Sequence, residues 1–329
     1  MKKYITVIFL FTLSSIMYAQ IADKPLFRDP VYDGAADPVV IWNKGEQKWF
    51  MFYTNRRANL KDVNGVDWVH KTPIGIAESA DGGVTWKYRG TANITYGGDD
   101  YTYWAPDIIE DNGTYHMYLT VVPGTFSDWK HSREIAHLTS DNLIDWQYQS
   151  SLSLASDKVI DAGVFKVKDN LWYLYYNNEK DRKSIYYAQS SDLKNWTDMG
   201  KVVADQSGEG PKVFYWHNKY FMIVDNWKGL GVYSSDDLKT WVRQDENILA
   251  VGGTGVDDGT NGLHADVVVN NNRAYIFYFT HPGRANGNSS DSYETRRSSI
   301  QVAELEYKDG IIVCDRDKPV QIKLTKTTL

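Results

Sequence analysis

The sequence predicts an all-β fold, a five-bladed β-propeller with four antiparallel strands in each blade. Three observations predict it: a repeated unit of short strands, turns at regular spacing, and no stretch with helical periodicity. Short strands without helices are typical of sandwiches, barrels and propellers, and a four-strand repeat favours the propeller. Five copies of the repeat follow one another, so we expect residues 20–329 to form a single propeller domain.

Each copy of the repeat opens with a short strand, followed by an aromatic strand and then by a strand that begins with Ile, Val or Gly. The first strand of a blade lines the central channel, so the residues that open these strands should meet at one mouth. Counting eleven or twelve residues back from each aromatic strand places five residues at equivalent positions: Asp37, Trp104, Asp161, Glu209 and His264.

Four copies close on a tryptophan, and three of these tryptophans follow a Ser- and Asp-containing turn. The turns contain Asp81, Asp192 and Asp237. An Asp in such a turn accepts hydrogen bonds from backbone amides, and the Trp that follows it packs between blades. We therefore interpret these three aspartates as structural and exclude them as catalytic acids.

The three carboxylates among the five opening residues indicate glycoside hydrolysis. Glu209 lies between Gly208 and Gly210, where a substrate can approach it closely. We assign Glu209 as the general acid, Asp37 as the base that activates water, and Asp161 as a neighbour that disfavours ionisation of the acid. This arrangement predicts inversion, with the acid and base roughly 6.5–9.5 Å apart.

Four further residues are candidates for substrate binding. Trp104 would stack on a sugar ring, and Tyr103 would extend that wall. Arg56 lies in a long insertion between the second and third strands of the first copy, where loops often determine specificity. Asp107 lies three residues beyond a mouth position, where it would contact substrate or have a structural role.

Several motifs together resemble glycoside hydrolase family 43, over the whole of residues 20–329. They are Ala36-Asp37-Pro38, Trp104-Ala105-Pro106-Asp107, Ile160-Asp161 and Ser207-Gly208-Glu209-Gly210-Pro211. The resemblance implies a propeller with an inverting Asp/Asp/Glu site that hydrolyses arabinofuranosides or xylosides, occasionally galactosides, of plant or algal polysaccharides. Two places depart from the family pattern: Ala162 replaces a frequent Pro, and Leu263-His264-Ala265 replaces Gly-His-Gly.

The resemblance also raises a metal question at His264. In arabinan-degrading relatives a His at this place helps to hold a hydrated cation, often calcium, in the channel. The alternative is a His that hydrogen-bonds across the mouth, because one His is a poor ligand set for a hard cation. We expect no cofactor in the chemistry itself.

Two other functions remain open from the sequence. One is an exo-glycosidase that acts on galactan or galactofuranose, and the other is a carbohydrate-binding propeller without catalysis. Retention of Asp37, Asp161 and Glu209 disfavours the second. A sialidase is disfavoured because such a site needs clustered arginines, and none of the five opening residues is an arginine.

The N-terminus predicts export from a bacterial cell to the periplasm or the medium. Lys2 and Lys3 precede an apolar run that ends at Ala19, which is typical of a signal peptide over residues 1–19. The net charge of −6 and the absence of Lys/Arg clusters argue against nucleic acid as a partner. Cys314 is the only cysteine, so no disulfide is expected. We expect a monomer without a membrane span, acting on an oligo- or polysaccharide.

Overall fold

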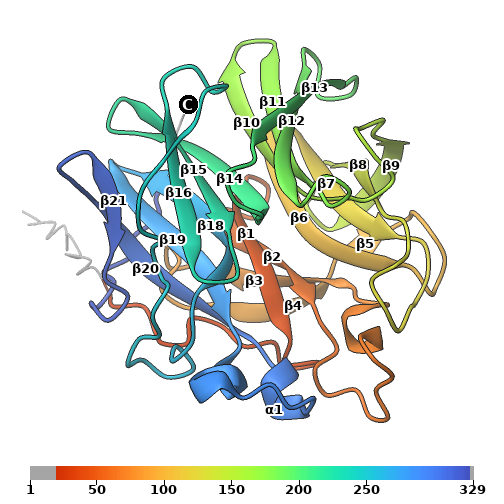
Figure 1. Ribbon diagram of the computed structural model, residues 1–329, viewed down its shortest axis with the longest axis vertical. Coiled ribbons are helices and arrows are strands. Elements are labelled where there is room, and N and C mark those ends of the chain that lie inside the picture. Colours follow the sequence, from red (N-terminus) through yellow and green to blue (C-terminus); the bar gives the residue numbers. More distant parts are fainter. Residues whose placement is uncertain (1–19, 327–329) are drawn as a thin grey trace, which may run out of the picture.

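The computed structural model describes residues 20–326, so the expected signal peptide of residues 1–19 lies outside the described chain. Within it, five antiparallel sheets stand in a ring (Figure 1). This arrangement is a five-bladed β-propeller, and it confirms the predicted fold.

Successive strands of the chain lie side by side within each blade. Blades 1 and 2 contain β1 (Ala35–Asn43), β2 (Lys48–Asn55), β3 (Ile74–Ser79), β4 (Lys87–Thr91), and β6 (Thr102–Asp111), β7 (Thr114–Val122), β8 (Glu134–Ser140), β9 (Asp145–Ser151). The short β5 (Asn93–Ile94) adds a parallel edge strand to blade 2. Blade 3 contains β10 (Val159–Lys168), β11 (Leu171–Asn178), β12 (Ser184–Ser190) and β13 (Thr197–Val203). Blade 4 contains β14 (Glu209–Trp216), β15 (Lys219–Asp225), β16 (Leu230–Ser235) and β17 (Val242–Arg243). Blade 5 contains β18 (Leu263–Asn270), β19 (Arg273–Thr280), β20 (Ser299–Lys308) and β21 (Ile311–Cys314).

The tryptophans that end the repeats pack between neighbouring blades, as predicted. Trp146 of blade 2 lies with its ring centroid 6.0 Å from that of Phe52 in blade 1. Trp86 of blade 1 contacts Phe277 of blade 5 at 6.4 Å, so the same type of contact closes the ring. The Asp81 carboxylate accepts hydrogen bonds from the amides of Val84 and Thr85, which confirms its structural role.

Helical turns occur only in two loops of the described chain. The 3-10 turn η1 (Asp67–Val69) lies in the long insertion between β2 and β3. The turn η2 (Pro282–Gly287) and the short helix α1 (Tyr293–Arg296) lie between β19 and β20. None of the described helices is long and apolar enough to cross a membrane.

Every first strand has an irregularity in its pairing at the same depth of the channel, and this irregularity corrects the predicted alignment of the blades. The last paired residues before it are Ala36, Trp104, Ile160, Glu209 and Leu263. The residues that follow are Asp37, Ala105, Asp161, Gly210 and His264. Trp104 and Glu209 therefore lie one position before the other three residues that we had aligned with them.

The error in alignment has a simple cause. The hairpin between β1 and β2 is longer than the others, because Asn43 pairs with Lys48. In addition, β10 has a second irregularity between Lys166 and Lys168. A count back from the second strand includes these extra residues and so shifts the assigned position in the first strand. The observed backbone pairing is not affected by them.

Candidate active site

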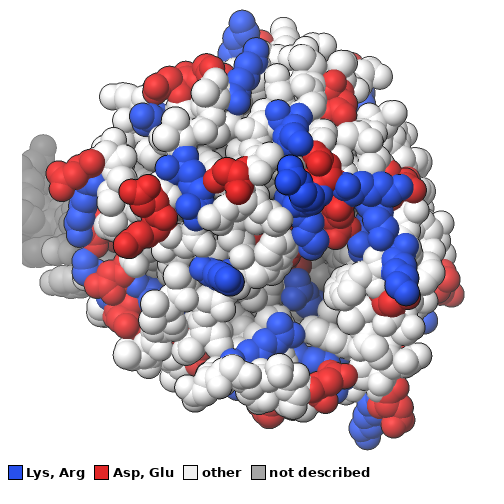
Figure 2. Space-filling model, in the orientation of Figure 1, with Lys and Arg blue, Asp and Glu red and all other residues white. Residues whose placement is uncertain are grey.

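A cavity of about 680 Å³ opens at one end of the central channel. It is lined by charged and aromatic side chains from several blades, including Asp37, Arg56, Trp68, Trp104, Trp129, Arg133, Lys158, Asp161, Glu179, Lys183, Glu209, Asp225, Trp227, His281 and Arg284. Figure 2 shows a hollow near the middle of the visible face, with Lys and Arg side chains around much of its rim. A pocket of this size can enclose one or two sugar rings.

Asp37 is buried at the start of the irregularity in β1, and Arg56 pairs with it. The Arg56 Nη2 atom lies 3.1 Å from both carboxylate oxygens of Asp37. Arg56 Nη1 lies 3.4 Å from Nε2 of His281, whose Nδ1 lies 2.9 Å from the carbonyl oxygen of Arg297. Burial lowers the pKa of His281 well below its ordinary value, and Arg284 and Arg56 act in the same direction. A neutral His281 with its proton on Nδ1 can therefore accept from Arg56 and orient it toward Asp37.

Asp161 is buried across the mouth from Asp37, and His264 lies between them. The His264 Nδ1 atom is 3.5 Å from Asp37 Oδ1 and 3.8 Å from Asp161 Oδ2. Asp161 Oδ2 also accepts a hydrogen bond from the Gly210 amide at 3.2 Å. Gly210 has φ +59°, and a Cβ at this position would lie 2.5 Å from His264 Cδ2, so only glycine fits here.

The pKa of Asp161 is raised well above its ordinary value. Burial is the main cause, and the charges of Glu209 and Asp37 add to it. The sequence analysis expected Asp161 to act on the proton of Glu209; the structure shows the reciprocal effect, in which Glu209 disfavours ionisation of Asp161. The proton of such a closely spaced group belongs to the cluster as a whole.

Glu209 is the most accessible of the three predicted catalytic carboxylates, since 24% of its side chain is exposed against 6% and 7% for Asp37 and Asp161. Its Oε1 accepts a hydrogen bond from the indole Nε1 of Trp227 at 3.0 Å. Its Oε2 lies 3.4 Å from Nζ of Lys183. The exposed carboxyl is the one that can reach a substrate oxygen.

Asp225 and Trp227 are site residues that the sequence analysis missed. Asp225 pairs with Glu209 across β14 and β15 and accepts hydrogen bonds from the amides of Trp227 (2.7 Å) and His264 (2.8 Å). Burial raises the pKa of Asp225 to about 8, and Glu209 contributes. Trp227 has φ +58°, which is rare for a bulky residue. The sequence signal for Asp225 is an acidic residue at the end of a second strand, whereas the predicted site residues came mainly from first strands.

An aromatic wall forms the side of the cavity next to blade 2. Trp104 lines the cavity, as predicted, and its indole Nε1 donates to the carbonyl oxygen of Val69 at 2.6 Å. Trp68 and Trp129 also line it, and the guanidinium of Arg133 lies over the Trp104 ring, 5.6 Å from its centroid. Arg133 in turn forms an ion pair with Glu179.

The structure corrects the position of Tyr103. Alternate residues of a strand face opposite sides, so Tyr103 points away from the cavity that Trp104 lines. Its ring packs in the apolar cluster between blades 1 and 2, and its hydroxyl donates to the carbonyl oxygen of Tyr96. Tyr103 therefore cannot extend the aromatic wall.

The structure also corrects Asp107, which lies deeper in the channel than the cavity. The Lys212 ammonium is buried between Asp107 (2.7 Å) and Asp266 (2.9 Å). Burial acts to lower the pKa of Lys212, but the two carboxylates outweigh it, and the pKa is raised. Asp107 also accepts a hydrogen bond from the Val164 amide at 2.6 Å. Its role is structural.

The donor set near His264 does not fit a hard divalent cation. Calcium takes six to eight oxygen ligands, whereas His264 faces Asp37 and Asp161, and the deeper carboxylates are paired with Lys212. Among residues 20–326, no group of three or more His, Cys, Asp or Glu side chains is placed to hold a metal ion. Calcium binding remains a prediction from the family resemblance.

The structure therefore brings Asp37, Asp161, Glu209, Trp104 and Arg56 together at the cavity, with His264 between two of the carboxylates. An accessible carboxyl beside carboxyl groups of raised pKa can act as a proton donor. A carboxylate oriented by an arginine can act as a proton acceptor for water. These are the two proton transfers that hydrolysis of a glycosidic bond requires.

Several solved structures that are similar to this chain are family 43 enzymes. A thermostable family-43 glycoside hydrolase has a TM-score of 0.66 at 19% identity and covers 92% of this chain and 100% of its own. A family 43 β-xylosidase/α-arabinofuranosidase from a compost microbial metagenome has a TM-score of 0.64 at 16% identity, covering 89% and 98%. A family 43 β-1,3-galactosidase has a TM-score of 0.65 at 16% identity, with the same coverage.

Curated relatives match a shorter part of the chain. A fructan β-fructosidase of Streptococcus mutans is 28% identical over 173 residues, and a probable sucrose-6-phosphate hydrolase of Psychromonas ingrahamii is 30% identical over 155 residues. These matches cover 44% and 40% of this chain, but only 12% and 28% of the relatives' own lengths. The profile of the glycosyl hydrolases family 43 matches residues 27–224. The chain therefore belongs to glycosyl hydrolase family 43.

Proposed function

We propose that this family 43 enzyme is an inverting glycosidase that removes pentosyl units, arabinofuranosyl or xylosyl, from plant or algal oligo- and polysaccharides. The observation that carries the proposal is the meeting of Asp37, Asp161 and Glu209, from three different blades, at one cavity. A structural propeller has no need for three carboxylates at this place, since burying them costs stability.

In the proposed mechanism Glu209 donates its proton to the glycosidic oxygen as the bond to the leaving group breaks. Asp37, oriented by Arg56, takes a proton from the water that attacks the anomeric carbon from the opposite face. Asp161 and Asp225 keep protons within reach of Glu209, because burial raises the pKa of both. Trp104 provides an apolar face for the sugar ring.

The pentose assignment is supported by the motifs around Asp37, Trp104, Asp161 and Glu209, and by the β-xylosidase/α-arabinofuranosidase among the solved structures of the same fold. The β-1,3-galactosidase has a similar TM-score, which supports a galactoside as the second candidate. Both structures are below 20% identity to this chain, so the substrate has to be determined by experiment. We also propose export, on the N-terminal signal pattern alone.

The test is turnover of a panel of 4-nitrophenyl glycosides and matching oligosaccharides by the purified protein. The panel contains α-L-arabinofuranoside, β-D-xyloside, β-D-galactoside and a short fructan. Glu209→Gln serves as the variant, and Glu306→Gln, on β20 and outside the cavity lining, is the matched control. We expect one glycoside to be hydrolysed by the parent chain and the control, with a loss of about 100-fold or more in Glu209→Gln.

Two outcomes would contradict the proposal. Turnover that Glu209→Gln retains would remove Glu209 as the acid. Tight binding of an oligosaccharide without turnover of any panel member would instead support the carbohydrate-binding propeller. Hydrolysis of the galactoside or the fructan alone would keep the mechanism but replace the pentose as the substrate.

A further inference from the structure

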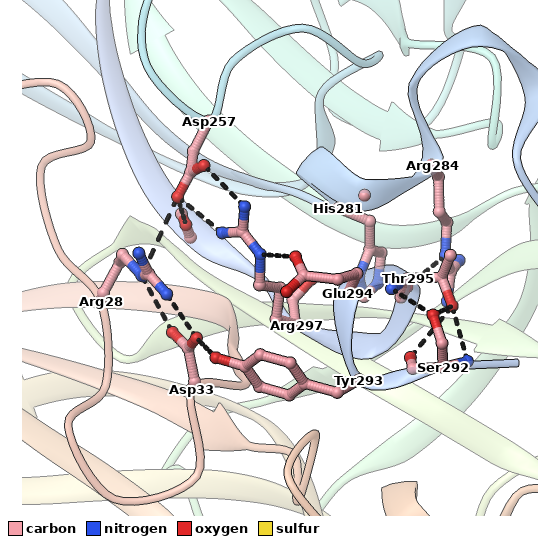
Figure 3. A network of polar contacts seen from close by, with 12 residues as sticks. Arg28, Asp33, Asp257, His281, Arg284, Ser292, Tyr293, Glu294, Thr295 and Arg297 are labelled. Atoms are coloured by element: carbon pink, nitrogen blue, oxygen red, sulfur yellow. Dashed lines mark hydrogen bonds and ion pairs between the residues drawn. The ribbon is translucent and has the colours of Figure 1, made fainter.

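The loop between β19 and β20 places an arginine, Arg284, at the edge of the cavity. Arg284 belongs to the turn η2, and its side chain lines the cavity next to His281 and Phe279. Its Nε donates to the carbonyl oxygen of Thr295 at 2.8 Å, which leaves the two terminal nitrogens of the guanidinium for a ligand. Figure 3 shows Arg284 beside Thr295 and His281.

A network of polar contacts anchors this loop to the body of the propeller (Figure 3). Arg297 pairs with Asp257 at 2.9 Å and with Glu294 at 2.9 Å. The Tyr293 hydroxyl donates to Asp33 at 2.5 Å. The capping box of Ser292 and Thr295 fixes the start of α1. The carbonyl oxygen that holds Arg284 is thus part of a fixed frame, and an anchored donor loses little entropy when a ligand binds.

Arg284 is a cation without a carboxylate partner. Among residues 20–326, no Asp or Glu oxygen lies within 4.0 Å of its side-chain nitrogens. One side of Arg284 is exposed to the solvent of the cavity, and protein surrounds its other sides. Desolvation by this surrounding protein lowers the pKa of Arg284 to about 10, and the nearby charge of Arg56 contributes, so the group stays charged at neutral pH.

The cavity as a whole is more basic than the chain. The chain carries a net charge of −6, yet five Lys and Arg side chains line the cavity: Arg56, Arg133, Lys158, Lys183 and Arg284. Five carboxylates also line it, so the two signs are balanced at the cavity, and burial raises the pKa of two of these carboxyl groups, Asp161 and Asp225. An anionic ligand is therefore favoured at this mouth over the surrounding surface.

We propose that Arg284 forms a subsite for an anionic substituent, so that the preferred substrate is a glycan carrying a carboxylate or sulfate group. The planar fork of a guanidinium matches either anion with two parallel hydrogen bonds. This inference rests on the proposed glycosidase function and specifies its substrate class: an acidic oligosaccharide rather than a neutral one.

The experiment measures binding to the Glu209→Gln chain, which does not consume its ligand. Isothermal titration calorimetry compares the methyl glycosides of galactose, galacturonic acid and galactose 6-sulfate, at low and high NaCl concentration. We expect an acidic ligand to bind about tenfold to hundredfold more tightly than galactose at low salt, as charge-assisted hydrogen bonds allow. The carboxylate and sulfate arms identify which anion the subsite takes.

Arg284→Gln, added to the same chain, should abolish this preference, and Arg284→Lys should retain part of it, because it keeps the charge but loses the fork. Arg89→Gln, at an outer strand, is the matched control and should keep the full preference. If Arg284→Gln unfolds, Arg284→Lys alone decides. Equal affinity for acidic and neutral ligands in the parent, or a preference that Arg284→Gln and Arg284→Lys both retain in full, would overturn the subsite.

This result is separable from the proposed function. Equal affinities together with hydrolysis of a neutral pentoside would overturn the anionic subsite and leave the glycosidase assignment standing. An Arg284-dependent preference together with no turnover in any assay would support the subsite and contradict the glycosidase.

Discussion

Two groups of carboxylates lie at different depths of the same channel, and their partners differ. In the deeper group, Lys212 is buried between Asp107 and Asp266 at 2.7 and 2.9 Å. In the group at the mouth, Asp161 and Asp225 receive backbone hydrogen bonds, but no Lys or Arg lies within 4.0 Å of either in the described chain. The deeper carboxylates thus share a buried ammonium as their partner, whereas burial raises the pKa of Asp161 and Asp225 at the mouth.

The role of an acidic residue in this channel therefore depends on the groups that it contacts and not on its position in the repeat. Asp107 and Asp266 occupy the same place in blades 2 and 5, two residues beyond the mouth, and Lys212 occupies it in blade 4. The ammonium of Lys212 thus pairs with both carboxylates across the channel. At the mouth, Arg56 pairs with Asp37, and Lys183 pairs with Glu209 and Glu179.

The largest effect on stability is expected for Lys212→Met. It leaves two buried carboxylates without a counter-charge, which should lower the free energy of unfolding by about 3–5 kcal/mol. Lys219→Met, whose ammonium lies 4.0 Å from the exposed Asp236, is the control and should change it by less than about 0.5 kcal/mol. Urea denaturation measures both. A Lys212→Met chain as stable as the parent would remove the structural role of the deeper group.

Asp161→Asn should show the opposite behaviour, a loss of activity with a gain in stability. The raised pKa of Asp161 means that the folded state binds its proton more tightly than the unfolded state does. Its ionisation therefore destabilises the folded chain, progressively, as the pH rises above the unfolded value of about 3.9.

Asn stays neutral, so the advantage of Asp161→Asn over the parent in free energy of unfolding should be small at pH 4 and larger at pH 9. Denaturant unfolding at both pH values measures it. An advantage that does not change with pH would show that Asp161 is not protonated in the folded chain.

A smaller effect is expected for Trp227→Phe. Phe keeps an aromatic ring at this position, but the hydrogen bond from the indole to Glu209 is lost. We expect kcat/KM to fall about fivefold, because one hydrogen bond contributes about 1 kcal/mol. Trp227→Leu, which also removes the ring, should lose more. Identical kinetics for Trp227→Phe and the parent would exclude Trp227 as a residue that positions Glu209.

The fold could be predicted from the sequence because its signal is repeated. The tryptophans that end the blades and the turns around Asp81, Asp192 and Asp237 recur at similar spacing, and each has one structural purpose. The candidate catalytic residues Asp37, Asp161 and Glu209 were proposed from the same repeat, because carboxylates near the start of first strands depart from a pattern that otherwise serves packing.

The rest of the site was not predicted correctly, for three physical reasons. Glu209 and Trp104 were aligned one position too late because hairpin length varies, and only backbone pairing reveals this. Asp225, Trp227 and Arg284 lie at strand ends and in loops, where the repeat carries no signal and only the packing of distant segments brings them to the cavity. Tyr103 was misplaced because strand alternation turns it away from its neighbour Trp104.

The central claim is that the mouth carboxylates do the chemistry and the deeper ones support the fold. The most direct test is a pair of equivalent substitutions, Asp37→Asn at the mouth and Asp266→Asn in the channel, each measured for kcat/KM on the hydrolysed glycoside and for unfolding in urea. We predict that Asp37→Asn loses about 100-fold or more in kcat/KM while remaining folded, and that Asp266→Asn loses stability while its folded fraction keeps turnover. An Asp37→Asn chain that stays active, or an Asp266→Asn chain that is stable but inactive, would contradict the account.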